Sequence, residues 1–282
     1  MKKRYLHFLI LGGILIFALI IRLSGLTKTS GLWYDEMALY SIASKSFFSG
    51  MLIEDAHRFL LFPIYFLTYK CWLSLFGNSD FIIRLMSVFF DMASLICAYF
   101  VGISFASLIN KNEQKYIVGL FNALLYSINS SFIYYAQEAK FYSLTFFLIN
   151  LLIIFWIKFL QNPNKTNKFL FLISNGLLLY TYTSQILLII ILQLATLFYF
   201  YKKNEIKKYT SQFLGFLIVL IPLFIMIFSN KNYFSGNFDA VVYDNSFILL
   251  VVQNWFSPIL AGLQNNILSY QYFVLMNILS IK

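Results

Sequence analysis

Residues 82–108 read IIRLMSVFFDMASLICAYFVGISFASL, and this run decides the fold class. A helix that crosses a bilayer needs about 20 consecutive, predominantly apolar residues. Continuous runs of this kind favour helices over the alternating strands of a membrane barrel. Asp91 lies inside the run, where an acid is a functional hypothesis because its burial is costly. The alternative, which we prefer, is a structural bond to a residue such as Asn122 or Asn129.

The composition extends this prediction to the whole chain. Hydrophobic residues make up 60% of it and charged residues only 11%, with a mean hydropathy of +0.76, whereas soluble domains carry about 25% charged residues. We therefore expect one all-α, polytopic transmembrane helix bundle over residues 1–282, with about seven or eight spans. Cys71 and Cys97 are expected to be small buried hydrophobic residues. The expected spans are residues 6–21, 82–108, 116–134, 142–160, 169–181, 186–201 and 213–228, and residues 247–263 are either an eighth span or an interfacial helix.

The distribution of charge predicts the topology. Lysine-rich loops near residues 112, 165 and 205 alternate with lysine-poor loops, which is the positive-inside pattern. The N-terminus and these loops are therefore expected in the cytoplasm. That side then carries 12 basic and 2 acidic residues, and the outer side carries 8 basic and 8 acidic residues. Arg22 is counted among the outer basic residues. The net charge of +10 thus reflects topology and does not predict nucleic-acid binding. Residues 22–81 form the first outer loop, and a C-terminal outer segment begins at 229.

Residues 59–76 are apolar but are interrupted by Pro63 and Lys70. If this run crossed the membrane, three basic loops would face outward. We therefore predict that it is an interfacial helix within the first outer loop.

Three of the acids on the outer side lie in two different loops that could converge. Asp35 and Glu36 belong to GLWYDEMALYSIA (residues 31–43), and Glu138 belongs to YYAQEAKFYSL (residues 134–144). Convergent carboxylates can take a proton from a hydroxyl or hold a divalent metal against a phosphate. The plainer alternatives are a solvated loop pair at 35–36 and a local ion pair between Glu138 and Lys140. If a metal is bound, Asp35 and Glu138 are its candidate ligands.

Four segments in order resemble the GT-C superfamily of membrane glycosyltransferases, in the branch of protein O-mannosyltransferases and lipid-A aminoarabinose transferases. Two are the acidic segments just quoted, and the others are FPIYFLTYKCWLSLFGNSDFIIRLMSVFFD (62–91) and LLLYTYTSQILLI (177–189). The resemblance covers roughly residues 1–200. It implies transfer of a sugar from a polyprenyl-phosphate donor to a lipid, glycan or protein acceptor, at the periplasmic face of a bacterial inner membrane.

The resemblance also implies roles for individual residues. Asp35 would be the catalytic base or a metal-linked acid, Glu36 would assist or orient it, and Glu138 would be the second-loop acid. The candidate substrate-binding residues are Lys140, Arg58, His57, Tyr65 and Gln137.

Two features depart from the family pattern. Many relatives carry a histidine directly before the proline of the P-x-Y motif, where this chain has Leu61-Phe62 before Pro63, and His57 is the nearest histidine. Relatives are also commonly longer. Two rival classes therefore stay open: a flippase or transporter for lipid-linked sugars, and a catalytically inactive assembly subunit with the same fold.

Overall fold

A computed structural model describes residues 2–26, 31–54, 59 and 62–229 of the 282 residues. These residues form helices and connecting turns, with no strand among them, which confirms the all-α prediction for the described part. The chain divides into two compact units, residues 1–223 and residues 224–282. The predicted helix at 247–263 and the outer segment after 229 lie outside the described residues.

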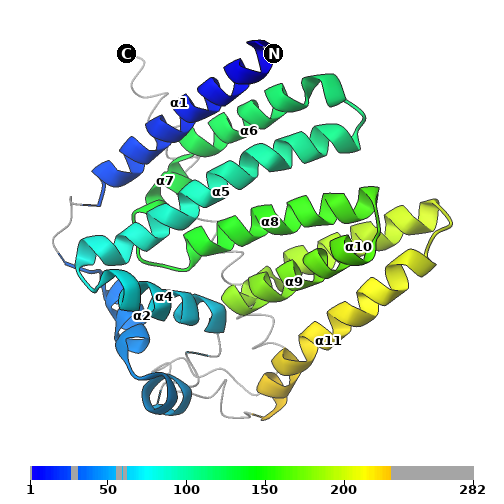
Figure 1. Cartoon of the computed structure of the whole chain (residues 1–282). Helices are drawn as coiled ribbons and strands as arrows, with labels where there is room; N and C mark the ends of the chain where they lie inside the picture. The colour runs from blue at the N-terminus through cyan, green and yellow to red at the C-terminus, as the bar shows by residue number, and fades with distance from the viewer. Residues whose placement is uncertain (1, 27–30, 55–58, 60–61, 230–282) are drawn as a thin grey trace, which may run out of the picture. The chain divides into compact units, whose positions relative to one another are not determined.

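Six of the seven predicted apolar runs each lie within one helix, and the run at 116–134 is divided between two; these apolar helices indicate a membrane protein (Figure 1). Among the described residues, four stretches are long and apolar enough to cross a bilayer: Leu6–Ser24, Asp80–Leu108, Tyr142–Gln161 and Thr183–Lys202. The helices are α1 (Lys2–Ser24), α5 (Asp80–Leu108), α6 (Lys115–Ile128), α7 (Ser130–Ala136), α8 (Tyr142–Gln161), α9 (Lys165–Thr181), α10 (Ile186–Lys202) and α11 (Lys207–Ser229).

Helix α5 lies between α6 on one side and α8 on the other, and α1 packs against both α5 and α6. The α5–α6 pair is close because it meets at two glycines. A Cβ atom added at Gly102 would lie 2.8 Å from the Cα of Gly119. Small residues at such crossings allow membrane helices to approach each other closely.

The predicted span at 116–134 is broken into two helices. Asn129 ends α6 in an extended conformation, and its side chain accepts hydrogen bonds from the amides of Ser131 (3.0 Å) and Phe132 (3.3 Å), which caps α7. The two helices differ in direction by 63°. Together they make a fifth candidate span, bent where the cap interrupts the helical hydrogen bonds.

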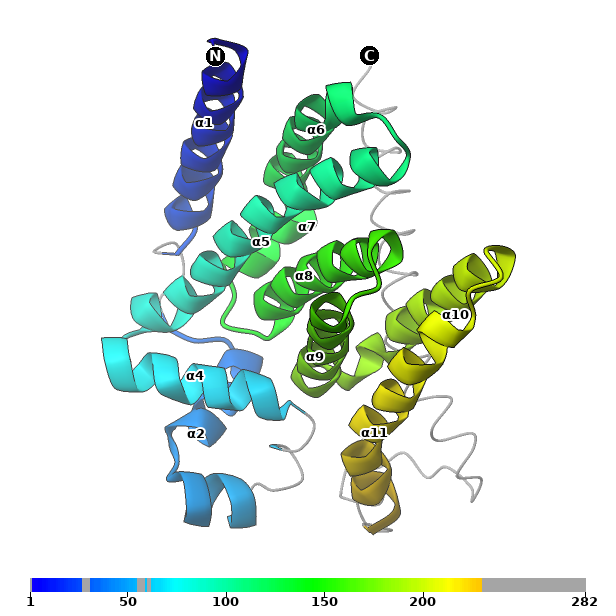
Figure 2. The same ribbon diagram turned by 45° about the vertical axis from the view of Figure 1, so that its right-hand side comes forward.

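The segment predicted as the first outer loop contains α2 (Tyr34–Ser44), the π-helix η1 (Phe47–Glu54) and α4 (Pro63–Phe76). Pro63 occupies the first turn of α4, a position where its missing N–H costs nothing, and Gly77 ends the helix with φ of 93°. At 14 residues α4 is about 21 Å long, too short to cross a bilayer core of about 30 Å. Both views place α2 and α4 at the end of the bundle where α5 begins (Figures 1 and 2).

The predicted partners of Asp91 were wrong. Its carboxylate accepts a hydrogen bond from Arg22 Nε and another from the Tyr126 hydroxyl (2.8 Å). Arg22, assigned to the outer side by the charge count, lies within α1, and the side chains of both Arg22 and Asp91 are fully buried. Asn122 instead donates to the Ala98 carbonyl at 2.6 Å. The preferred structural role of Asp91 therefore rests on a buried ion pair between α1 and α5.

The expectation for Cys71 was also wrong, since this residue of α4 is exposed, while Cys97 is half-buried. Both are free thiols.

Candidate functional site

The segment around Asp35 and the segment around Glu138 meet at Lys140. Its ammonium lies 3.2 Å from the Asp35 carboxylate and 3.3 Å from the Glu138 carboxylate. Those two carboxylate oxygens are therefore at most about 6.5 Å apart, although 103 residues of chain separate them. The structure thus places together the two acids that the sequence analysis assigned to one face.

The two acids differ in exposure. The Asp35 side chain, in the first turn of α2, is 68% exposed, whereas that of Glu138 is 8% exposed. Lys140, at 18%, lies between them. An external molecule can therefore reach Asp35 directly, while Glu138 acts mainly on Lys140.

Glu36, the neighbour of Asp35, is fully buried and joins the two loops to α5. Its carboxylate accepts hydrogen bonds from Arg84 Nε (3.1 Å) and Nη2 (2.8 Å) and from the backbone amides of Ala139 (2.7 Å) and Trp33 (2.9 Å). Burial acts to raise the pKa of Glu36, but the bonds from Arg84, Ala139 and Trp33 outweigh it and hold the pKa below its usual value. Glu36 therefore stays ionised, and its geometry fits the orienting role better than proton transfer.

Further hydrogen bonds fix the second loop, residues 137–141, against the bundle. The Ser87 hydroxyl donates to the Glu138 carbonyl (2.5 Å), and the Tyr65 hydroxyl donates to the Ala139 carbonyl (3.1 Å). Gln137 donates its side-chain amide to the Ile21 carbonyl of α1 at 3.1 Å. Tyr65 and Gln137, both expected to bind substrate, thus hold the loop in place.

The loop is also tightly packed next to Gln137. A Cβ atom at Gly25 would lie 2.0 Å from that side chain. A larger residue at position 25 would therefore force the Gln137 side-chain amide to move.

The electrostatics at the centre of the site keep Lys140 charged. Partial burial lowers the pKa of Lys140, but the carboxylates of Glu138 and Asp35 more than reverse this and raise it. An ammonium offers three N–H donors, and that of Lys140 forms ion pairs with both acids.

A divalent metal does not fit this arrangement. The Lys140 ammonium already lies between Asp35 and Glu138, and a metal there would have to displace it. In the part of the chain that the structure describes, no three His, Cys, Asp or Glu side chains lie together as candidate metal ligands. Because Lys140 holds the position between the two acids, we assign no role to a metal.

An aromatic cluster adjoins Lys140. Phe141 stacks on Phe62 at a centroid distance of 4.6 Å and lies 4.6 Å from Tyr182, which belongs to the turn after α9. Tyr142 lies 4.5 Å from Phe141. These rings bring the P-x-Y segment, the second loop and the third outer turn together beside the acids.

Two structural residues of the site were not predicted. Arg84 was counted only as an outer charge, and Ser87 was not considered. The signal for Arg84 was available, because a cation within an apolar helix requires a partner. His57 and Arg58, the remaining substrate-binding candidates, lie outside the described residues.

Taken together, the apolar helices and the two linked loops indicate a membrane protein that is helical in its described part and has an acid–lysine–acid site. The family model for the N-terminal domain of the protein O-mannosyl-transferase TMEM260 matches residues 62–208, just over half of the chain. The chain belongs to this family, whose name supports a membrane glycosyltransferase-like protein. The matched residues include Tyr65, Glu138 and Lys140, while Asp35 and Glu36 precede them. No individual curated protein matches the chain.

Proposed function

We propose that this chain is a GT-C glycosyltransferase that takes a sugar from a polyprenyl-phosphate donor and transfers it to a hydroxyl of a lipid, glycan or protein. The observation that carries the proposal is the Lys140 ammonium, which lies within 3.3 Å of both Asp35 and Glu138. Membership of the protein O-mannosyl-transferase TMEM260 family supports it and makes mannose the first sugar to test.

The reaction assigns different work to the three side chains. Asp35, the exposed acid, accepts the proton of the acceptor hydroxyl as its oxygen forms a bond to the anomeric carbon. The bond from that carbon to the donor phosphate oxygen breaks, and the electron pair leaves with the lipid phosphate. Direct displacement inverts the configuration of the anomeric carbon. The Lys140 ammonium stabilises the developing phosphate charge, and Glu138 keeps Lys140 protonated and in position.

Glu36 and Arg84 support this chemistry by positioning. Glu36 is bonded to the Ala139 amide, in the residue directly before Lys140, and it follows Asp35 in α2. One buried carboxylate therefore sets the distance between the base and the cation. His57 and Arg58 remain proposals for additional contacts to the donor phosphate.

The proposed topology places this site on the outer, periplasmic face of a bacterial inner membrane, with the N-terminus in the cytoplasm. Besides the five candidate spans, we propose that α9 and α11 cross the bilayer, and that α4 lies at the interface. Helix α9 has 17 residues, about 25 Å, which is near the thickness of the hydrocarbon core. The loops rich in lysine all join the helix ends opposite to α2 and α4, in agreement with the positive-inside rule.

The transporter alternative receives little support from the charges inside the bundle. Arg22 and Asp91 are both fully buried, and they neutralise each other. A transport path requires such groups to face a water-filled cavity. The inactive-subunit alternative is disfavoured by the linked pair of acids around Lys140.

The function is tested with isotope-labelled donors in membranes that contain the full chain. A labelled polyprenyl-phosphate sugar and the matching nucleotide sugar are compared, with Asp35→Asn as the inactive variant. We expect transfer from the lipid-linked sugar alone, lost in Asp35→Asn. Direct transfer from the nucleotide sugar, or equal transfer by the variant, would contradict the proposal.

A further inference from the structure

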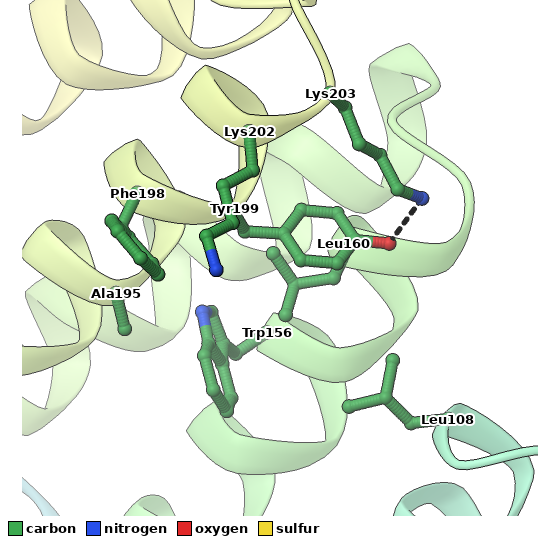
Figure 3. A pocket seen from close by; sticks show the side chains of 8 residues that line it. All are labelled: Leu108, Trp156, Leu160, Ala195, Phe198, Tyr199, Lys202 and Lys203. Atoms are coloured by element: carbon green, nitrogen blue, oxygen red, sulfur yellow. Dashed lines mark hydrogen bonds between the residues drawn. The ribbon is translucent and has the colours of Figure 1, made fainter.

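A second feature lies at the other end of the bundle, between α8 and α10. It is an open pocket of about 420 Å³ with an apolar floor and wall formed by Trp156, Leu160, Ala195 and Phe198 (Figure 3). The indole N–H of Trp156 donates to the Thr196 hydroxyl at 2.7 Å. The polar atom of Trp156 is thereby satisfied within the protein, and its ring is left as an apolar surface. A volume of this size is typical of a small-molecule or lipid site.

The pocket is distant from the acid–lysine–acid site. Leu108, at the last turn of α5, lines it, whereas Arg84 near the start of α5 holds Glu36. The 24 residues between Leu108 and Arg84 span about 36 Å along one helix. The two sites therefore belong to opposite sides of a bilayer, and the chemistry proposed for one does not explain the other.

Two lysines border the apolar part of the pocket. Figure 3 shows Lys202 and Lys203 on the two sides of the Tyr199 ring. The Lys203 ammonium donates to the Tyr199 hydroxyl at 2.6 Å, and the Lys202 ammonium lies 4.8 Å from the centroid of Phe198. Both cations are thus directed by aromatic rings that also belong to the pocket.

The acid nearest to these lysines in sequence forms its ion pair with another residue. Glu205 forms its ion pair with Lys208, at 2.6 Å. The pocket is lined by two cations and otherwise by apolar or aromatic residues, with no acid among them. Basic pockets between membrane helices on the cytoplasmic side are suited to anionic lipid head groups.

We propose that this pocket binds one anionic phospholipid from the leaflet opposite to the acid–lysine–acid site. An acyl chain lies against Trp156 and Ala195, and the phosphate lies at the end of the pocket that Lys202 and Lys203 border. The helix ends place the lysines at the depth of the head groups and the apolar lining at the depth of the acyl chains, so one lipid satisfies both parts.

Fluorescence of Trp156 tests the proposal without any measure of activity. The full chain is reconstituted in phosphatidylcholine vesicles that contain the same minor fraction of either dibrominated phosphatidylglycerol or dibrominated phosphatidylcholine. The contribution of Trp156 is the difference between the wild-type protein and Trp156→Phe. We expect stronger quenching of Trp156 by the brominated phosphatidylglycerol.

Two variants and a control locate the binding. The excess quenching is the quenching of Trp156 by brominated phosphatidylglycerol beyond that by brominated phosphatidylcholine. Lys202→Gln/Lys203→Gln should abolish it. Ala195→Phe, which fills the pocket, should also abolish it, with both lysines present. Lys165→Gln/Lys207→Gln removes two exposed lysines outside the pocket and should leave the excess unchanged.

Three results would overturn the proposal. They are equal quenching by the two lipids, an excess that survives both pocket variants, and an excess that the lysine control abolishes as fully as Lys202→Gln/Lys203→Gln. The last result would mean general attraction of anionic lipid to a basic surface.

Discussion

Replacement of Glu36 by glutamine tests whether a buried carboxylate holds the two outer loops together. In the wild-type protein this carboxylate receives four N–H groups, two of them from the buried Arg84. Glutamine keeps the volume but removes the charge, and its amide presents N–H donors where an acceptor is needed. Loss of one partner of a buried ion pair costs about 3–5 kcal/mol. We expect a decrease of that size in the free energy of unfolding.

The assay is thermal unfolding of the purified protein in detergent. For a chain of this size about 2–4 °C accompanies each kcal/mol, so the melting temperature of Glu36→Gln should fall by roughly 10 °C. Asp35→Asn is the matched control, because the Asp35 side chain is 68% exposed and a surface ion pair contributes little. Its melting temperature should equal that of the wild-type protein.

The pH dependence gives an independent check. Because the folded-state pKa of Glu36 is lowered from 4.5, its stabilising contribution is fully present above that pH. The contribution is lost as the pH falls through the lower folded value. The free energy of unfolding of Glu36→Gln should therefore decrease less than that of the wild-type protein over this pH range. A variant with wild-type stability and wild-type acid sensitivity, but without transferase activity, would refute the positioning role.

Three further predictions concern the bundle. Arg22→Met leaves Asp91 buried without its partner and should lower the free energy of unfolding by about 3–5 kcal/mol. Arg22→Met/Asp91→Asn should recover much of that stability. A double variant as unstable as the single one would argue against the pairing. Gly102→Ala should lower the free energy of unfolding by about 1–3 kcal/mol because α5 and α6 must separate. Gly12→Ala, in open space, should be neutral or slightly stabilising. Equal melting temperatures for the two variants would contradict this. Cys71, exposed on α4, should react with a membrane-impermeant maleimide in intact cells. Labelling only in broken cells would place α4 on the cytoplasmic side and contradict the proposed topology.

Hydrophobic runs and charge placement were sufficient to predict the helices. Each apolar run is helical because only a helix satisfies its own backbone hydrogen bonds in lipid. The break at Asn129 was missed because the run continues in composition, and only the side-chain cap interrupts it. Charge placement also put Asp35 and Glu138 on one side, which the contacts to Lys140 match.

Partners far apart in the sequence could not be predicted. Arg22 and Asp91 are 69 residues apart, and Glu36 and Arg84 are 48 apart. Periodicity describes one helix at a time and contains no information on which neighbouring helix supplies a counter-ion. Burial alone indicated that Asp91 needs a partner, but the choice of Arg22 depends on how α1 packs against α5.

The most direct test of the central claim is the transfer rate of Asp35→Asn relative to Asp80→Asn. Asp80 is an exposed acid at the start of α5, at the same end of the bundle, so both variants remove one charge there. Loss of a general base typically lowers the rate by about 10²–10⁴-fold. We predict a loss of that size for Asp35→Asn, with wild-type melting temperature, and near-normal transfer by Asp80→Asn. Equal rates for the two variants would show that Asp35 is not the catalytic base.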